Sequence, residues 1–354
     1  MKTIKTRSII IALVLNLVSL ATAQTPANLS LQVTNGAVRL NITGTISNAC
    51  TIQYATNLTQ SNPWHYKTNF GLVNSSTIFL DANQPSVSVG FYRIFTQALP
   101  TNVIPVTNMI WISPGTFSMG SPTNEALQSS DEMQHTVTLT KGFYMGKYLV
   151  TQADYQTLIG SNVSFFTTNQ GYAQNLNLPV EQISWNDATN YCGRLTQQEM
   201  LAGRLQTGWA YRLPTESEWE YACRAGTKTA FYYGNTLQSG KANFDGRYEY
   251  DSNLGTINNS TGINLTQTTV VGSYEANAWG LSDMCGNVLE WCSDWYGSYP
   301  DGNTTDPQGA ATGSYHIVRG GGFGYQGVYC RSAQRGVAAG FVNYLGFRVV
   351  LASN

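Results

Sequence analysis

The chain reads RLPTESEWEYA from Arg212 to Ala222, and this stretch predicts a helix whose two ends are both marked. Thr215 and Glu218 form the Thr-x-x-Glu pattern of a capping box, in which the threonine hydroxyl and the glutamate carboxylate each bind a free backbone N–H at the helix start. Gly226 supplies the left-handed residue that commonly closes a helix. We therefore expect a helix from Glu216 to Arg224.

Two further helix starts precede this one. Thr151 is placed to N-cap a short helix that stops at Gly160. Ser184 is placed to cap another through Asp187, and that helix would bury Trp185, Ala188, Tyr191 and Leu195. Elsewhere this part of the chain is rich in glycine, asparagine and aromatic residues with short apolar segments. The pattern predicts an α+β domain with many irregular loops.

Residues 25–98 show a different pattern, in which short segments alternate between apolar and polar residues with a period of two and are separated by turn residues. The segments are Leu31–Val33, Val38–Ile42, Cys50–Tyr54, Thr77–Leu80 and Phe91–Phe95. They predict a small all-β sandwich, similar to accessory modules of exported bacterial proteins that act as spacers or adhesive surfaces. Pro100 and Pro105 mark a linker over 99–107, and the second domain would cover 108–353.

The first residues have the layout of a secretory signal peptide. Lys2, Lys5 and Arg7 precede an apolar run from Ile9 to Leu20 that is short for a membrane span, and Ala-Thr-Ala then ends at Ala23. An uncleaved amphipathic anchor is the alternative. We expect residues 1–23 to be removed and the protein to be secreted, periplasmic or on the cell surface, with no transmembrane anchor.

Composition excludes several classes of function. The formal net charge is −1 and only 11% of residues are charged, which argues against nucleic acid or an anionic membrane as partner. The three histidines are far apart in sequence, and Cys285 and Cys292 have no CxxC partner. A histidine-rich metal centre or a structural zinc site is therefore not expected.

Seven blocks along the chain carry a family resemblance. They are Met109–Gly120, Pro179–Ala188, Arg212–Ala222, Gly280–Trp291, Val318–Gly322, Cys330–Ala333 and Leu345–Arg348. Together they resemble the formylglycine-generating (sulfatase-modifying factor) family from about residue 109 to residue 350. The resemblance implies an elaborated C-type-lectin-like α+β fold, a scaffold that also serves non-enzymatic ligand binding.

The resemblance also implies an oxidase centre, in which two nearby cysteines after an Arg-Gly-Gly-Ser block bind copper(I) and convert a substrate cysteine to formylglycine. Soft thiolates are the ligands that copper(I) selects. Here the chain reads RGGGFGYQGVYC from Arg319 to Cys330 and holds one cysteine. Gly322, Leu289 and Tyr344 replace the family's serine, tryptophan and asparagine. Copper is therefore not expected.

Cys330 has two interpretations. It is either the surviving catalytic thiol or, by its resemblance to the family's structural cysteine, the disulfide partner of Cys223, which export would favour. A second family pair is broken because Val349 stands where the partner of Cys192 would be. Cys192 is then free or paired with Cys285 or Cys292, and the state of Cys50 stays open.

The resemblance implies a calcium site as well. Asp283, Gly286, Val288 and Glu290 match a loop in which two side-chain oxygens and two backbone carbonyls converge, and oxygen ligands of this kind suit calcium. The alternative is a solvated turn and a cap. A weaker second site would use Asn243 and the carbonyl of Phe244.

Tyr325, Tyr329, Arg331 and Arg335 form a candidate ligand pocket, since aromatic and arginine side chains are common in binding surfaces. The alternative is ordinary packing and ion pairing. The leading hypothesis is an exported, non-catalytic protein that binds a protein, peptide or glycan ligand. Its competitor is a formylglycine-generating oxidase or a related enzyme with an altered centre.

Overall fold

The computed structural model describes residues 108–353 except 206, 254–255 and 339–342, together with the backbone of seven strands between residues 10 and 98. The chain divides into two compact units, Met1–Thr101 and Asn102–Asn354, and each is described by itself. The whole of the expected linker at 99–107 lies outside the described residues. Most of the expected signal peptide lies outside them too.

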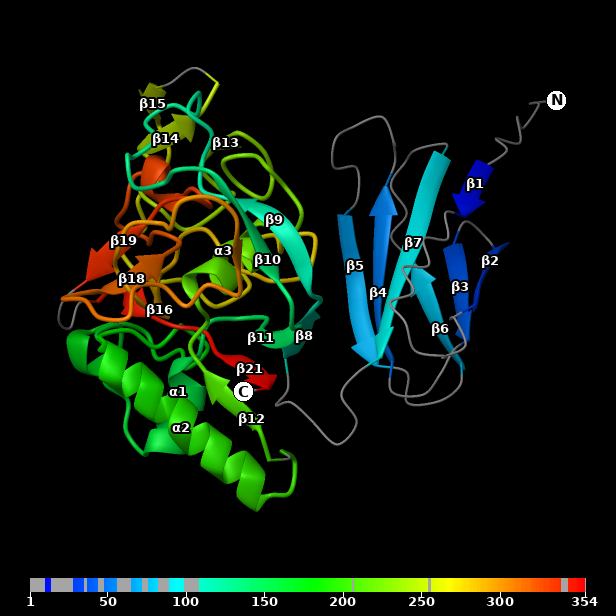
Figure 1. Cartoon of the computed structure of the whole chain (residues 1–354), viewed down its shortest axis with the longest axis horizontal. Helices are drawn as coiled ribbons and strands as arrows, with labels where there is room; N and C mark the ends of the chain where they lie inside the picture. Colours follow the sequence, from blue (N-terminus) through cyan, green and yellow to red (C-terminus); the bar gives the residue numbers. More distant parts are fainter. Residues whose placement is uncertain are drawn as a thin grey trace. The chain divides into compact units, whose positions relative to one another are not determined.

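The described residues of the first unit all lie in strands (Figure 1). They are β1 Ile10–Leu13, β2 Asn28–Thr34, β3 Ala37–Thr43, β4 Asn48–Ala55, β5 His65–Gly71, β6 Ser76–Asp81 and β7 Val89–Ala98. One sheet has the order β1-β7-β4-β5 and the other β2-β3-β6. The five expected segments lie within β2, β3, β4, β6 and β7. The sequence pattern missed β5, and β1 falls inside the expected signal peptide, parallel to β7.

The second unit mixes few helices with many short strands, so its α+β class is confirmed. The helices are α1 Gln152–Ile159, α2 Trp185–Leu201 and α3 Glu216–Arg224, with 3-10 turns η1 Thr168–Gln170 and η2 Gly327–Cys330. The strands are β8 Met109–Ile112, β9 Gly115–Met119, β10 His135–Leu139, β11 Phe143–Gly146, β12 Trp209–Arg212, β13 Thr236–Leu237, β14 Tyr248–Asp251, β15 Thr256–Asn259, β16 Leu289–Trp295, β17 Thr304–Thr305, β18 His316–Arg319, β19 Gly336–Ala338, β20 Leu345–Gly346 and β21 Val350–Ser353. In the part of the chain that is described, no helix has the length and apolar character needed to cross a bilayer.

All three helices begin as the sequence predicts. Thr151, Ser184 and Thr215 each accept a hydrogen bond from the backbone of the third helical residue, whose acidic side chain bonds back to the cap, so each start is a complete capping box. Helix α3 ends at Arg224, as the sequence predicts, and Gly226 is left-handed with φ 90°. Ala225 adopts the left-handed conformation with φ 46°, one position before Gly226.

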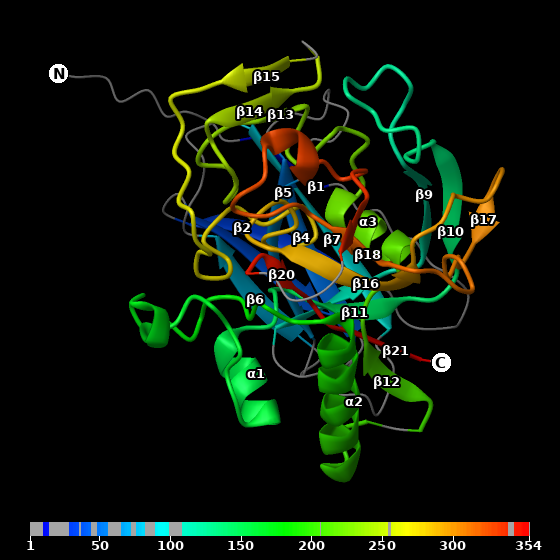
Figure 2. The same ribbon diagram turned by 90° about the vertical axis from the view of Figure 1, so that its left-hand side faces the viewer.

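Four small sheets surround α3 in this unit. Their strand orders are β12-β21-β11-β8, β19-β18-β16-β20, β17-β10-β9 and β13-β14-β15. The long helix α2 packs on β12, and both views show the two side by side (Figures 1 and 2). The short helix α3 contacts β9, β16 and β18, which places it in the middle of the unit.

Helix α3 is buried along its whole length, including its acidic side chains Glu216, Glu218 and Glu220. Glu220 binds Arg224 at 2.8 Å and also Arg319, and it accepts a hydrogen bond from the backbone N–H of Gly120. Burial alone would raise the pKa of Glu220, but Arg224 and Arg319 outweigh burial and hold it below its usual value. A buried carboxylate of this kind is stable only as part of such a network.

The other two carboxylates of α3 are paired in the same way. Glu216 receives two hydrogen bonds from Arg335, at 2.7 and 2.9 Å. Glu218 receives two from Arg212, at 2.6 and 2.7 Å. Bidentate arginine–carboxylate pairs fix geometry as well as charge. The helix is therefore connected by charge pairs to β12, β18 and the segment after η2.

Replacement of Glu220 by glutamine should destabilise the fold by about 3 to 5 kcal/mol, because it leaves the two buried guanidinium groups without their counter-ion. Urea unfolding at pH 7 measures this loss. Since the pKa of Glu220 is lowered in the folded state, its contribution is present at neutral pH and is lost as the pH falls through that lowered pKa.

Glu275→Gln is the matched control. Glu275 forms an ion pair of 3.8 Å with Lys241 in which both side chains are largely exposed, so the same substitution there should change the unfolding free energy by less than about 1 kcal/mol. Equal losses in the two variants would contradict the role assigned to Glu220.

Candidate functional site

Cys330 lies at the end of η2 with no exposed surface. Burial raises the pKa of its thiol to about 12. The backbone at Gly321, with φ +71°, closes over the sulfur, since a Cβ built at Gly321 would lie 2.5 Å from it. The reactive form of cysteine is the thiolate. Cys330 is therefore a protonated thiol packed in the core.

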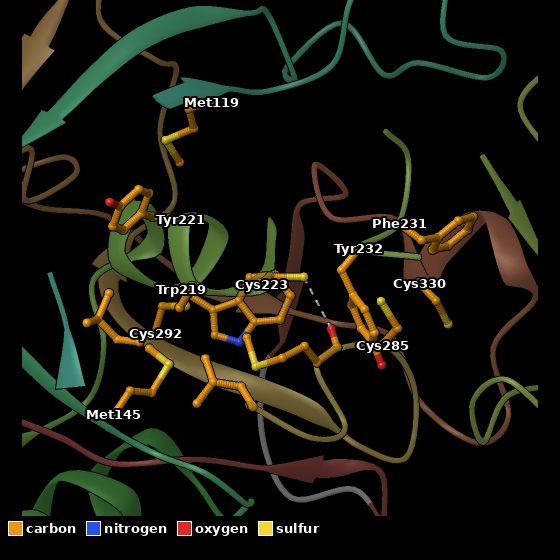
Figure 3. Close-up of a cluster of buried hydrophobic side chains, with 14 of the residues drawn as sticks. Met119, Met145, Trp219, Tyr221, Cys223, Phe231, Tyr232, Cys285, Cys292 and Cys330 are labelled. Carbon is orange, nitrogen blue, oxygen red and sulfur yellow. Dashed lines mark hydrogen bonds between the residues drawn. The ribbon is translucent and has the colours of Figure 1, made fainter. Parts of the chain in front are cut away.

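All five described cysteine side chains are free thiols: Cys192, Cys223, Cys285, Cys292 and Cys330. Figure 3 shows Cys223, Cys285 and Cys330 on one side of the Trp219 indole. The Cys223 sulfur contacts the carbonyl oxygen of Met284 at 3.6 Å and the hydroxyl of Ser332 at 3.5 Å, and it hydrogen-bonds with Cys285.

The structure thus differs from the disulfide expected between Cys223 and Cys330. Cys285, which the resemblance left unassigned, is the cysteine that contacts Cys223, and burial raises the pKa of Cys285 well above its ordinary value. Cys192 and Cys292 are separate buried thiols on α2 and β16. The side chain of Cys50 lies outside the described part.

The three positions that depart from the oxidase pattern adjoin one another. The N–H of Leu289 donates to the carbonyl of Tyr344 at 2.7 Å. A Cβ built at Gly322 would lie 3.5 Å from the backbone nitrogen of Leu289. The Tyr344 ring packs edge-on against Tyr325 at 5.4 Å. A leucine, a glycine and a tyrosine offer no soft ligand, and with one protonated thiol nearby these residues do not fit copper(I).

The candidate pocket of Tyr325, Tyr329, Arg331 and Arg335 is not formed. Arg331 has no exposed surface and binds Glu125 and Glu132 at 2.6 and 2.8 Å. Arg335 is buried and binds Glu216 at 2.7 Å. Tyr325 and Tyr329 pack edge-on at 6.0 Å, with Tyr329 44% exposed. The structure therefore shows ion pairing for both arginines, which was the alternative interpretation.

Asp283 lies in the buried loop before β16, and Glu290 is the second residue of that strand. Asp283 has a left-handed backbone with φ 58°, and its Oδ2 accepts a hydrogen bond from Gly272 at 2.6 Å. Its Oδ1 is buried and has no partner among the described residues. Burial raises the pKa of Asp283 to about 6, and the nearby Glu290 adds to this effect. An unpartnered carboxylate oxygen is chemically suited to bind a hard cation.

Glu290 is less available as a cation ligand, because both of its carboxylate oxygens already have partners. Both of its oxygens are bound by Arg348, at 2.6 and 2.8 Å, and Oε2 also accepts from the Trp219 indole at 2.9 Å. The loop packs closely, since a Cβ at Gly286 would lie 2.4 Å from the carbonyl of Asn243. Val288 is fully buried. Calcium at this loop would thus use Asp283 and backbone carbonyls and would share Glu290 with Arg348.

The weaker calcium candidates lie beside this loop. Asn243 is buried and donates to the carbonyl of Gln267 at 3.0 Å, while its Oδ1 has no partner among the described residues. Phe244 is also buried. Within the described residues, no group of three or more His, Cys, Asp or Glu side chains gathers in a way that could hold a metal.

A separate pocket of about 440 Å³, which no sequence pattern indicates, lies between the end of β16, the start of α3 and the 297–310 loop. Asp294 lines it and is 4% exposed. Its Oδ2 accepts from the N–H of Glu216 at 2.9 Å and from the hydroxyl of Ser293 at 3.0 Å. Asp294 has no diagnostic spacing, because its partner Glu216 is 78 positions away in the sequence.

The sequence matches the family of sulfatase-modifying factor enzyme 1-like domains over residues 95–353. The chain belongs to this family. Its α+β unit is accordingly an elaborated C-type-lectin-like domain, as the sequence blocks predict. The solved structure of PvdO from Pseudomonas aeruginosa resembles it with a TM-score of 0.55 and 28% identity, covering 70% of this chain and 94% of that one.

Two curated relatives differ in what they do. The formylglycine-generating enzyme of Streptomyces coelicolor is 38% identical over 161 residues, which is 44% of this chain and 45% of that protein. The chaperone protein LppX of Paenibacillus barcinonensis is 32% identical over 223 residues, which is 53% of this chain and 71% of that protein. The chain thus spans less than half the length of the Streptomyces enzyme it matches. Membership of the family establishes the fold. The activity has to be inferred from the residues of the candidate site.

Proposed function

We propose that the protein is an exported, non-catalytic member of the family that uses the scaffold to bind a ligand. The observation that carries this proposal is the state of Cys330, a fully buried thiol whose pKa is raised to about 12. A thiol that stays protonated and closed off supplies neither a copper ligand nor a nucleophile. The relative named as a chaperone supports a role of this kind for the scaffold.

The replaced residues support the same proposal. Leu289, Gly322 and Tyr344 adjoin one another through their backbones, and their side chains include no thiol, amide or carboxylate. An oxidase working there would need soft or polar ligands from other residues. Export rests on the layout of residues 1–23, which has the charged, apolar and small-residue regions of a signal peptide. The ligand is proposed to be a protein, peptide or glycan outside the cytoplasm.

Oxygen uptake with a cysteine-containing sulfatase peptide and copper tests the proposal. We expect the rate to equal that of the peptide and copper without protein, and Cys330→Ser to leave it unchanged, because the thiol takes no part. Uptake above this background that disappears in Cys330→Ser would support the oxidase and contradict the proposal.

We also propose that calcium binds at Asp283, with the carbonyls of Gly286 and Val288 and with Glu290. The support is the buried Oδ1 of Asp283, which lacks a partner among the described residues. A hard cation would supply the positive charge that balances this carboxylate and would lower the pKa of Asp283. The contribution would be to stability of the loop rather than to chemistry.

Melting temperature in calcium and in chelator checks this proposal. The parent protein should melt at a higher temperature with calcium, and Asp283→Asn should remove the difference. Asp301→Asn is the control, because Asp301 is exposed in the loop after β16 and the same change there should leave the calcium effect intact. A chelator that has no effect on the parent protein would rule the site out.

A further inference from the structure

The pocket beside Asp294 is a built cavity in which apolar, aromatic and polar groups converge. Apolar side chains of Met119, Pro300 and Pro307 line it, together with the rings of His135, Trp295 and Tyr299. Its volume of about 440 Å³ is within the range of small-molecule sites and is far larger than a bare metal ion needs. The Tyr299 ring is held between His135, at 4.6 Å, and the guanidinium of Arg335, at 4.0 Å.

Asp294 carries an unpaired charge into this pocket. Its Oδ2 is satisfied by Glu216 N and Ser293 Oγ, whereas Oδ1 takes no hydrogen bond from any described residue. No lysine or arginine of the described residues lies within ion-pair distance of it, although Glu216 and Glu218 nearby are each paired with an arginine. Buried carboxylates are normally paired, and this one is not.

The backbone of Gly309 approaches the Asp294 side chain closely, as only a residue without a side chain can. A Cβ built at Gly309 would lie 2.8 Å from Oδ1 of Asp294. Thr304, in β17, lines the same pocket, and its hydroxyl is buried without a partner among the described residues. The oxygen that the pocket offers to a ligand is therefore Oδ1 of Asp294, because the Thr304 hydroxyl has almost no accessible surface.

An organic ammonium has the complementary chemistry. An ammonium group has three N–H donors and no acceptor, so it suits oxygen atoms that lack donors. Its positive charge balances an isolated carboxylate and is attracted to aromatic rings such as those of Trp295 and Tyr299. A neutral alcohol or sugar would leave the charge of Asp294 unpaired, and an anion would repel it.

We propose that this pocket binds a small primary ammonium compound, with Oδ1 of Asp294 as its counter-ion. The apolar and aromatic walls would contact the hydrocarbon part of the ligand. The inference deepens the binding role proposed above and rests on it. The binding and oxygen-uptake assays have separate outcomes, so failure of one is distinguishable from failure of the other.

The pH dependence follows from the surroundings of Asp294. Burial, with Glu216 and Glu218 adding to it, raises the pKa of Asp294 to about 7. The titratable groups that face it from neighbouring elements are Glu216 and Glu218 on α3, Arg212 on β12, His316 on β18 and Cys292 on its own strand. Ammonium binding needs the deprotonated carboxyl, so affinity should fall as the pH drops through 7.

The test titrates n-butylammonium, 1-butanol and butyrate into the full-length protein, with binding followed by ligand-observed NMR at pH 8 and pH 5.5. We expect n-butylammonium to bind at least about tenfold more tightly than the other two at pH 8, and more weakly at pH 5.5. Asp294→Asn should weaken its binding at least about tenfold and remove the pH dependence, while Asp301→Asn should leave both unchanged.

Asparagine can still accept from Glu216 N and Ser293 Oγ, and melting curves check that the variant folds. If the variant does not fold, the pH series on the parent protein keeps the test decisive. Equal binding of butanol and n-butylammonium would overturn the proposal in favour of a neutral ligand. Unchanged ammonium binding in Asp294→Asn, or no saturable binding by the parent protein at up to about 10 mM, would also overturn it.

Discussion

The fold depends on the burial of three carboxylates on one short helix. Glu216, Glu218 and Glu220 cannot stay charged inside the protein without counter-ions, so each requires an arginine to be brought to α3. The arginines come from β12, from β18 and from the segment after η2, as well as from the helix itself. The ion pairs of α3 therefore fix the positions of separate parts of the chain relative to this helix.

The same network sets the geometry of the pocket. The start of α3 presents the N–H of Glu216 to Asp294, and the pair of Glu216 with Arg335 forms part of the wall. Tyr299 donates to Glu216 at 3.3 Å and is covered by Arg335, so the aromatic side of the pocket is fixed by the same carboxylate. Among the described residues, no arginine forms an ion pair with Asp294, unlike the three glutamates of α3.

Local patterns in the sequence predicted local structure well. Thr151, Ser184 and Thr215 cap the helices that their own neighbours in sequence define, and period-two alternation located five strands of the first unit. Long-range pairings were not predictable in this way. Arg331 and Glu132 are 199 positions apart, and Cys223 contacts Cys285 from a distance of 62 positions in the numbering, so only folding reveals these partners. The same holds for Asp294. Arg331 and Arg335, which were expected to line a ligand pocket, instead pair with carboxylates that are far away in the sequence.

The central claim is that this chain keeps the family's fold, while Cys330, the one cysteine in the stretch from Arg319 to Cys330, is buried in the core. Alkylation of the native protein with iodoacetamide at pH 8, followed by peptide mass analysis, tests it most directly. The account predicts that Cys330 is unmodified in the native protein and modified after denaturation without reductant, since it is a buried free thiol. Rapid modification of Cys330 in the native protein would contradict the account and point back to a reactive thiol.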